Sequence, residues 1–126
     1  MSTSYAARFS GELFCVEIRT ARWAAMVAWY RDTLGLRSLV RVSEDRYALL
    51  AAGASRLALV GISDQENGKS PSALVFEVPN LTAAEESLYT AGERILRRRI
   101  HPEGFHELTL NDPDGNCVRL IAWPSE

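Results

Sequence analysis

Four charged side chains in this sequence stand in settings where they could do chemistry. Glu17, Glu77 and Glu107 are carboxylates and Arg119 is a guanidinium, and each lies in a stretch that predicts a strand. Around Glu17 and Glu107, apolar and polar residues alternate, which is typical of a half-buried β-strand. A carboxylate in a cleft can act as a general acid or base, whereas the planar fork of arginine suits carboxylate and phosphate groups. Either use requires that several strands bring these side chains together.

Arg119 has two interpretations that the sequence leaves open. An unpaired buried arginine costs several kcal/mol, so we expect a carboxylate beside it, either Glu17 or Glu77. In the first interpretation, the arginine closes a structural salt bridge inside a sheet. In the second, it holds an anionic or polar ligand with its planar fork.

The cysteines and histidines carry weaker signals. Cys15 and Cys117 lie far apart in a chain that is long enough to form a core without disulfides, so we expect free thiols. His106 and Glu107 are adjacent and could be taken for two metal ligands, but neighbouring residues of a strand point to opposite faces. His101 lies across a short turn from them. We therefore expect no metal at these histidines.

The elements that must position these residues occur twice along the chain. In the first half, apolar residues at every second position predict a strand at 12–20, and apolar residues at helical spacing predict a helix from about Trp23 to Gly35. The glycine is expected to end that helix because it adopts left-handed backbone readily. Three further strands are predicted at 37–43, 46–51 and 56–61.

The second half repeats this order after a polar segment, 63–72, that we expect to be a linker. A strand is predicted at 73–78, and Thr82 has the spacing of a helix cap before a helix that ends at Gly92. Three strands are predicted at 94–100, 104–110 and 117–122. The last two are joined by Asp112-Pro113-Asp114-Gly115, which fits the type I turn of a hairpin.

Composition and charge limit the partners of this chain. With 126 residues, of which 47% are hydrophobic, it is long enough for a single domain with its own core. The 14 basic and 16 acidic residues leave a formal net charge of -2, which favours neither nucleic acid nor an anionic membrane. The only basic run, 97–99, would be split between two faces of a strand. No signal pattern or membrane-spanning apolar run is present, so we expect a cytoplasmic protein.

Three motifs in order carry a resemblance to a known family. Cys15 lies fifteen residues before Tyr30, a Leu34-Gly35 helix stop follows, and Asp112-Pro113-Asp114-Gly115-Asn116 precedes the last strand. In this order the chain resembles the vicinal oxygen chelate superfamily, which includes glyoxalase I, bleomycin-resistance proteins, fosfomycin-resistance enzymes and extradiol dioxygenases. The resemblance implies an α+β fold of two βαβββ modules, at 12–62 and 73–123. Their sheets would curl into a cup, usually within a homodimer.

Metal-dependent members of that superfamily line the cup with His and Glu on the first strand of each module and on its last. By resemblance, these positions fall on Cys15, Ala58, Ala73 and Arg119. Alanine offers no ligand atom and arginine keeps its positive charge, so we expect no metal and no other cofactor. With the polar residues that alternation adds on the same side, the predicted ligand pocket consists of Cys15, Glu17, Ala58, Ala73, Glu77, Glu107, Cys117 and Arg119.

Three classes of function fit these residues. The first is a metal-independent small-molecule binder, similar to the bleomycin-resistance proteins, in which a homodimer sequesters its ligand. The second is a lyase, isomerase or dioxygenase that uses Glu17, Glu77 or Glu107 as acid or base, or recruits an unusual metal shell. A raised carboxylate pKa in the cup would favour this second class. The third is a dimeric regulatory or scaffold module whose cup is filled by its own side chains. We expect the first class.

Overall fold

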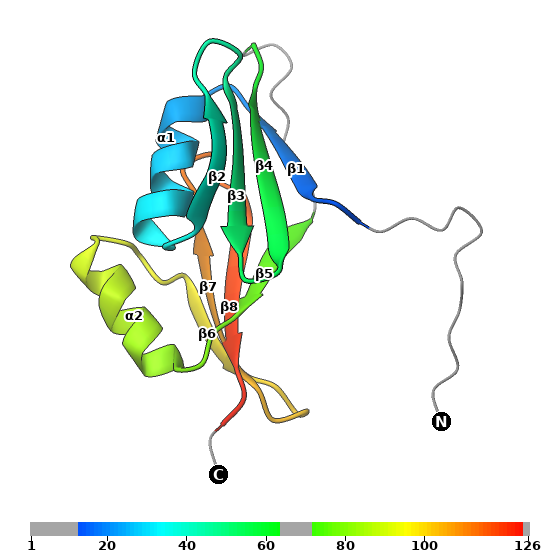
Figure 1. The fold of residues 1–126 in the computed structure, drawn as a ribbon. Helices are drawn as coiled ribbons and strands as arrows, with labels where there is room; N and C mark the ends of the chain where they lie inside the picture. Colours follow the sequence, from blue (N-terminus) through cyan, green and yellow to red (C-terminus); the bar gives the residue numbers. More distant parts are fainter. Residues whose placement is uncertain (1–12, 64–71, 125–126) are drawn as a thin grey trace, which may run out of the picture.

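The computed structural model describes residues 13–63 and 72–124, which form two units with the same order of elements (Figure 1). The first unit comprises β1 (Val16–Thr20), α1 (Trp23–Ala28), the π-helical turn η1 (Trp29–Thr33), β2 (Arg37–Val42), β3 (Tyr47–Ala52) and β4 (Ser55–Gly61). The second comprises β5 (Ala73–Glu77), α2 (Leu81–Thr90), β6 (Arg97–Ile100), β7 (His106–Asn111) and β8 (Cys117–Ala122). The predicted α+β fold with two βαβββ modules is confirmed. The expected linker at 63–72 lies outside the described residues except for Ser63 and Ser72.

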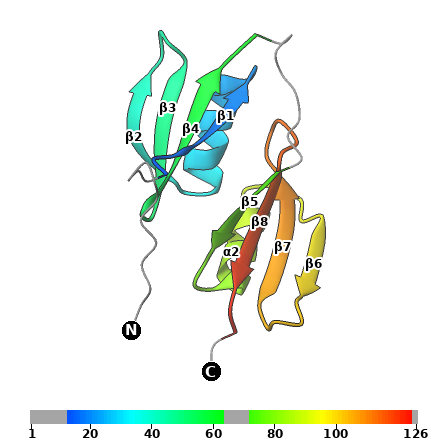
Figure 2. The ribbon, with the colours of Figure 1, turned by 90° about the vertical axis from the view of Figure 1, so that its right-hand side faces the viewer.

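Each unit forms its own four-stranded sheet. The strand orders are β1-β4-β3-β2 and β5-β8-β7-β6, so the first strand of each unit is an outer strand and pairs in parallel with the last. The other strand pairs are antiparallel. Both helices lie on the same side of the two sheets (Figures 1 and 2). We call the opposite side of each sheet its open face, and both open faces turn in the same direction.

One apolar core joins the helix-facing sides of the two units. Met26 and Tyr30 of the first unit are fully buried, as are Leu110 and Val118 of the second. The same cluster also contains Trp23, Val27, Trp29, Leu36, Ala48, Leu50, Leu57, Leu59, Leu88 and Leu120. Burial of a large aliphatic side chain stabilises a fold by about 1.5–3 kcal/mol, so this core fixes the two units against each other.

The two helices begin and end for identifiable local reasons. The first continues, as predicted, to Gly35, whose φ of 82° lies in the left-handed region. Its final turn, η1, is π-helical. The predicted cap of the second helix was wrong: Asn80, not Thr82, caps it, because the Asn80 side chain accepts a hydrogen bond from the Ala83 N–H at 3.0 Å. No helix within 13–63 or 72–124 is long and apolar enough to cross a membrane.

Candidate functional site

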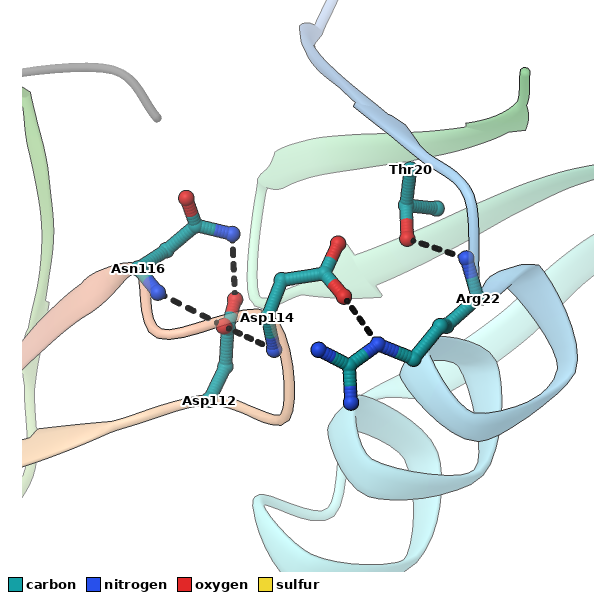
Figure 3. A network of polar contacts seen from close by, with 5 residues as sticks. All are labelled: Thr20, Arg22, Asp112, Asp114 and Asn116. Carbon is teal, nitrogen blue, oxygen red and sulfur yellow. Dashed lines mark hydrogen bonds and ion pairs between the residues drawn. The ribbon is translucent and has the colours of Figure 1, made fainter. Parts of the chain in front are cut away.

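The hairpin turn between β7 and β8 is built around one buried carboxylate (Figure 3). Asp112 is 4% exposed, and its Oδ1 accepts hydrogen bonds from the backbone N–H groups of Asp114 at 2.9 Å and Asn116 at 2.8 Å. Its Oδ2 accepts a hydrogen bond from the Asn116 side chain at 2.8 Å. The Gly115 N–H donates to the Asp112 carbonyl oxygen at 2.9 Å, which confirms the predicted turn.

The same carboxylate joins the two units. Tyr30, on η1 of the first unit, donates its hydroxyl hydrogen to Oδ2 of Asp112 at 2.7 Å. Burial, with this hydrogen bond and the neighbouring negative charges, holds the pKa of Tyr30 well above its ordinary value. Nearby, Nε of Arg22 lies 3.4 Å from Oδ1 of Asp114 (Figure 3). Because four donors already occupy the two oxygens of Asp112, this carboxylate is structural and offers a ligand no free acceptor. Oδ1 of Asp114 is buried without a hydrogen-bond partner and is balanced by the ion pair with Arg22.

The open face of the second sheet carries a different polar cluster, which we call the charged rows. The strand register pairs Arg119 of β8 with Thr109 of β7, and Thr109 with Arg97 of β6. The next row on the same face consists of Ile121, Glu107 and Arg99. Side chains two residues apart on a strand point the same way, so both rows project from one face. The charges of three strands therefore meet on one side of the sheet.

Three rings, which we call the aromatic row, follow the charged rows where the hairpin of β6 and β7 closes. Phe105 stacks on His101 with ring centroids 4.1 Å apart, and it meets Trp123 nearly edge-on at 5.2 Å. A hydrogen bond of 2.9 Å from the His101 N–H to the Phe105 carbonyl holds these two residues opposite each other. The turn between them requires left-handed backbone, which Gly104 supplies with a φ of 108°.

Glu107 is the centre of the charged rows. Its side chain is 7% exposed, and its Oε1 accepts a hydrogen bond from Nε2 of His101 at 2.8 Å. Its Oε2 accepts one from Oγ1 of Thr109 at 3.3 Å and lies 3.8 Å from Nε of Arg119. Burial alone would raise the pKa of Glu107, but the His101 and Thr109 hydrogen bonds and the Arg119 charge outweigh it and hold the pKa below its usual value. Glu107 is therefore ionised near neutral pH.

Arg119 is only partly satisfied by this carboxylate. The Nε atom is buried and has no hydrogen-bond partner, because 3.8 Å is an ion-pair distance and not a hydrogen bond. The side chain as a whole is nevertheless 42% exposed. Arg119 is thus held at its inner nitrogen and remains accessible from the open face.

The predicted partner of Arg119 was wrong, since Glu107 and neither Glu17 nor Glu77 lies beside it. Glu17 belongs to the other sheet, and Glu77 is an exposed residue of the outer strand β5. Glu107 lies on an inner strand, where its low exposure and fixed position strengthen the attraction between its carboxylate and the Arg119 guanidinium. Sequence reasoning also missed His101; the three-residue turn after it could have placed it diagonally across from Glu107.

The predicted pocket residues fall into two groups on the two sheets. The first group consists of Glu17 and Ala58 on the first sheet and Cys15, which directly precedes β1. The second sheet carries Ala73, Glu77, Glu107, Cys117 and Arg119. Within the groups, Glu17 pairs directly with Ala58, and Ala73 pairs with Cys117. Both open faces turn toward the viewer in Figure 2, one above the other. The structure therefore divides the predicted pocket between two sheets, while the shared core that joins the units lies on the helix-facing side.

A groove of about 840 Å³ lies between the two units. It is bounded by the end of η1 and the β3–β4 turn of the first unit and by β5 and α2 of the second. Much of its wall is apolar and helix-facing, as with Leu34, Leu74 and Phe76. Of the predicted pocket, only Glu77 lines this groove. No residue of the charged rows lines it, but the groove borders them at Val75, which pairs with Arg119.

The two matching βαβββ units define an α+β protein of a known class. A family model described as the Glyoxalase/Bleomycin resistance protein/Dioxygenase superfamily matches residues 13–120. That span is most of the sequence, and the chain belongs to this superfamily. No curated protein matches the sequence significantly.

Solved structures share this fold at low sequence identity. Lactoylglutathione lyase from Agrobacterium tumefaciens is similar with a TM-score of 0.74 and 16% identity, over 88% of this chain and 92% of that one. TnmS3, an antibiotic binding protein from Streptomyces sp. CB03234, has a TM-score of 0.77 and 18% identity, over 90% and 97%. A glyoxalase/bleomycin resistance protein from Catenulispora acidiphila has a TM-score of 0.69 and 21% identity, over 86% and 96%. These similarities establish the fold.

The expectation that the superfamily's metal positions hold residues unsuited to a metal ion stays a prediction from the resemblance. By resemblance, those positions are Cys15, Ala58, Ala73 and Arg119. Two of them provide no ligand atom, and the arginine carries a permanent positive charge that opposes a cation. Within residues 13–63 and 72–124, no group of three or more His, Cys, Asp or Glu side chains could hold a metal ion.

Proposed function

We propose that this protein binds a small organic molecule on the open face of its sheets, without a metal and without converting it. The observation that carries the proposal is the surface around Arg119. Val75, its direct pairing partner on β5, and Trp123, which follows β8, are each 53% exposed. Small-molecule sites are clefts lined mostly by apolar and aromatic side chains with a few fixed polar groups, and the side chains of this face have that composition.

The state of Glu107 favours binding over acid catalysis. A general acid needs a raised carboxyl pKa, whereas the pKa of Glu107 is lowered. Both of its oxygens are also occupied, by His101 and by Thr109. Glu107 is therefore better suited to hold Arg119 than to transfer a proton. One similar structure is an antibiotic binding protein, which supports a binding role, and another is a lyase, which keeps catalysis as the alternative.

We further assign a homodimer to the functional state. Among the described strands, β1 and β5 are outer strands, each hydrogen-bonded on one side only. They also expose apolar side chains, Val16 at 43% and Val75 at 53%. Outer strands with exposed apolar residues are templates for pairing with another chain. A second copy would extend the two open faces and enclose a ligand between them.

Binding is tested by titrating 15N-labelled protein with a panel of neutral and charged aromatic fragments and recording amide shifts. The expected result is that some fragments shift the amides of Thr109, Arg119 and Ile121 and are recovered unchanged after incubation. If no fragment shifts these amides, the binding site is not on this face. If a fragment is converted, the protein is an enzyme and the alternative function takes precedence.

The dimer is tested separately by light scattering, where we expect twice the mass of one chain. Val16→Lys should lower the dimer fraction, because a charge on the outer strand opposes pairing. The matched control is Thr90→Lys, at the exposed end of α2, which should leave the dimer unchanged. A wild-type protein that remains monomeric at tens of micromolar would contradict the dimer and leave the binding proposal standing.

A further inference from the structure

We infer that the open face of the second sheet binds an aromatic monocarboxylate, with the carboxylate on Arg119 and the ring against the aromatic row. This inference rests on the proposed function and specifies the chemical class of its ligand. The juxtaposition of one accessible, pre-positioned guanidinium and an exposed ring on the same face carries it.

The anchor for the carboxylate is already built. Glu107 lies against Nε of Arg119 and is itself fixed by hydrogen bonds from His101 and Thr109. This arrangement restricts the arginine before any ligand arrives, so less side-chain entropy is lost on binding. The 42% exposure of Arg119 leaves it reachable from solvent. Its planar fork matches the two oxygens of a carboxylate.

The charge balance of this face favours a single negative charge. Arg97 and Arg99 lie on the same face of β6 and are exposed, and Glu77 lies on the same face of β5 beside Ile121. With Arg119 and Glu107, these side chains give the face three positive and two negative charges. The ionised Glu107 offsets part of that charge close to the anchor. A doubly charged phosphate would meet stronger repulsion from Glu107 than a monocarboxylate would. The site therefore suits a weakly charged, planar anion.

The distance along the strand sets the size of the apolar part. Trp123 follows Arg119 by four residues on the same face, which corresponds to about 13 Å between their Cα atoms. Ile121 lies between them on the same face and is half-buried. A bicyclic aromatic acid can reach from the guanidinium across this isoleucine to the indole. Phe105 holds that indole from the side, with ring centroids 5.2 Å apart.

The probe pair is 2-naphthoate and 2-naphthamide, which have the same shape and differ in charge. The readout is the indole N–H signal of Trp123, which is distinct because the indoles of Trp23 and Trp29 already donate to Leu59 and Glu93. We expect 2-naphthoate to bind the wild-type protein at least 10-fold more tightly than 2-naphthamide, which is about 1.4 kcal/mol. Equal affinities would overturn the assignment of a carboxylate.

Two variants separate the two parts of the site. Arg119→Gln should abolish the preference for 2-naphthoate, while the matched control Arg98→Gln, on the helix-facing side where Arg98 pairs with Glu85, should keep it. Trp123→Ala should weaken both probes several-fold, as followed by the Arg119 amide, and preserve the preference. A preference that survives Arg119→Gln, or probe affinities unchanged by Trp123→Ala, would overturn the inference. If neutral fragments shift the amide signals of this face while 2-naphthoate is not preferred over 2-naphthamide, the proposed function stands and only the ligand class is wrong.

Discussion

Two buried carboxylates in the second unit, Asp112 and Glu107, are put to opposite uses. They are similarly inaccessible, at 4% and 6% exposure. Asp112 accepts four hydrogen bonds, including one from Tyr30 of the other unit, and its surroundings are closed. Glu107 fixes Arg119, whose inner nitrogen has no hydrogen bond and whose side chain stays accessible. Asp112, whose hydrogen-bonding positions are all filled, therefore stabilises the fold. Glu107 positions an arginine that can still bind a ligand.

Replacement of the saturated carboxylate should have the largest effect on stability. Asp112→Ala leaves the buried Tyr30 hydroxyl and the turn amides without an acceptor, and each unsatisfied buried donor costs about 1–3 kcal/mol. We expect the free energy of unfolding to fall by about 3 kcal/mol or more, measured by urea denaturation. The matched control is Asp45→Ala, in the exposed turn between β2 and β3, which should change it by less than about 0.5 kcal/mol. Equal effects of the two substitutions would contradict the structural role of Asp112.

Removal of a single donor from the same cluster should cost less. Tyr30→Phe deletes only the hydroxyl that bonds Asp112, so we expect a loss of about 1–2 kcal/mol. Tyr89→Phe is the matched control because Tyr89 is 82% exposed, and it should be neutral. A neutral Tyr30→Phe would mean that the contact between the units does not depend on this hydrogen bond.

The same tyrosine predicts a specific dependence on pH. Its pKa is raised in the folded state, so its contribution is fully present below the unfolded pKa of about 10 and is lost as the pH rises above it. The free energy of unfolding of the wild-type protein should therefore fall above pH 10, by up to about 1.4 kcal/mol per pH unit. Urea denaturation between pH 8 and about 11 checks this, and Tyr30→Phe should show the shallower slope. Identical slopes would contradict the raised pKa.

The carboxylate of the charged rows should contribute less than Asp112. Glu107→Gln keeps the shape but removes the charge, and we expect a loss of about 1 kcal/mol at neutral pH. The pKa of Glu107 is lowered in the folded state, so its contribution is present above the unfolded pKa of about 4.3 and is lost as the pH falls through the lower folded value. The difference between wild type and variant, measured by denaturation at pH 7 and at pH 3, should therefore shrink at the lower pH. A difference that grows there would be inconsistent with the lowered pKa.

The two clusters were not equally predictable from the sequence. The turn at Asp112 could be predicted because its hydrogen bonds join residues within four positions of one another. Such a local pattern can be recognised without knowing which strands are neighbours. The partner of Arg119 depends on which strands are neighbours and on their register, and alternation alone fixes only the face of each side chain. The contact of His101 with Glu107 also depends on register, but it lies within one hairpin, so the three-residue turn after His101 could have indicated it. The spacing of the apolar residues in the first helix did not indicate that its last turn, η1, is π-helical.

Substitution of Arg119 should have the smallest effect on stability of all, and this distinguishes its two interpretations. A structural salt bridge whose loss strands a buried charge costs about 3–5 kcal/mol, whereas partly exposed ion pairs contribute about 0–1 kcal/mol. Because Arg119 is 42% exposed and makes no hydrogen bond through Nε, we expect Arg119→Gln to change the free energy of unfolding by about 0.5 kcal/mol or less. The measurement is urea denaturation beside Arg98→Gln. A loss of more than about 2 kcal/mol, specific to Arg119, would assign this arginine to the fold and remove the ligand anchor from the open face.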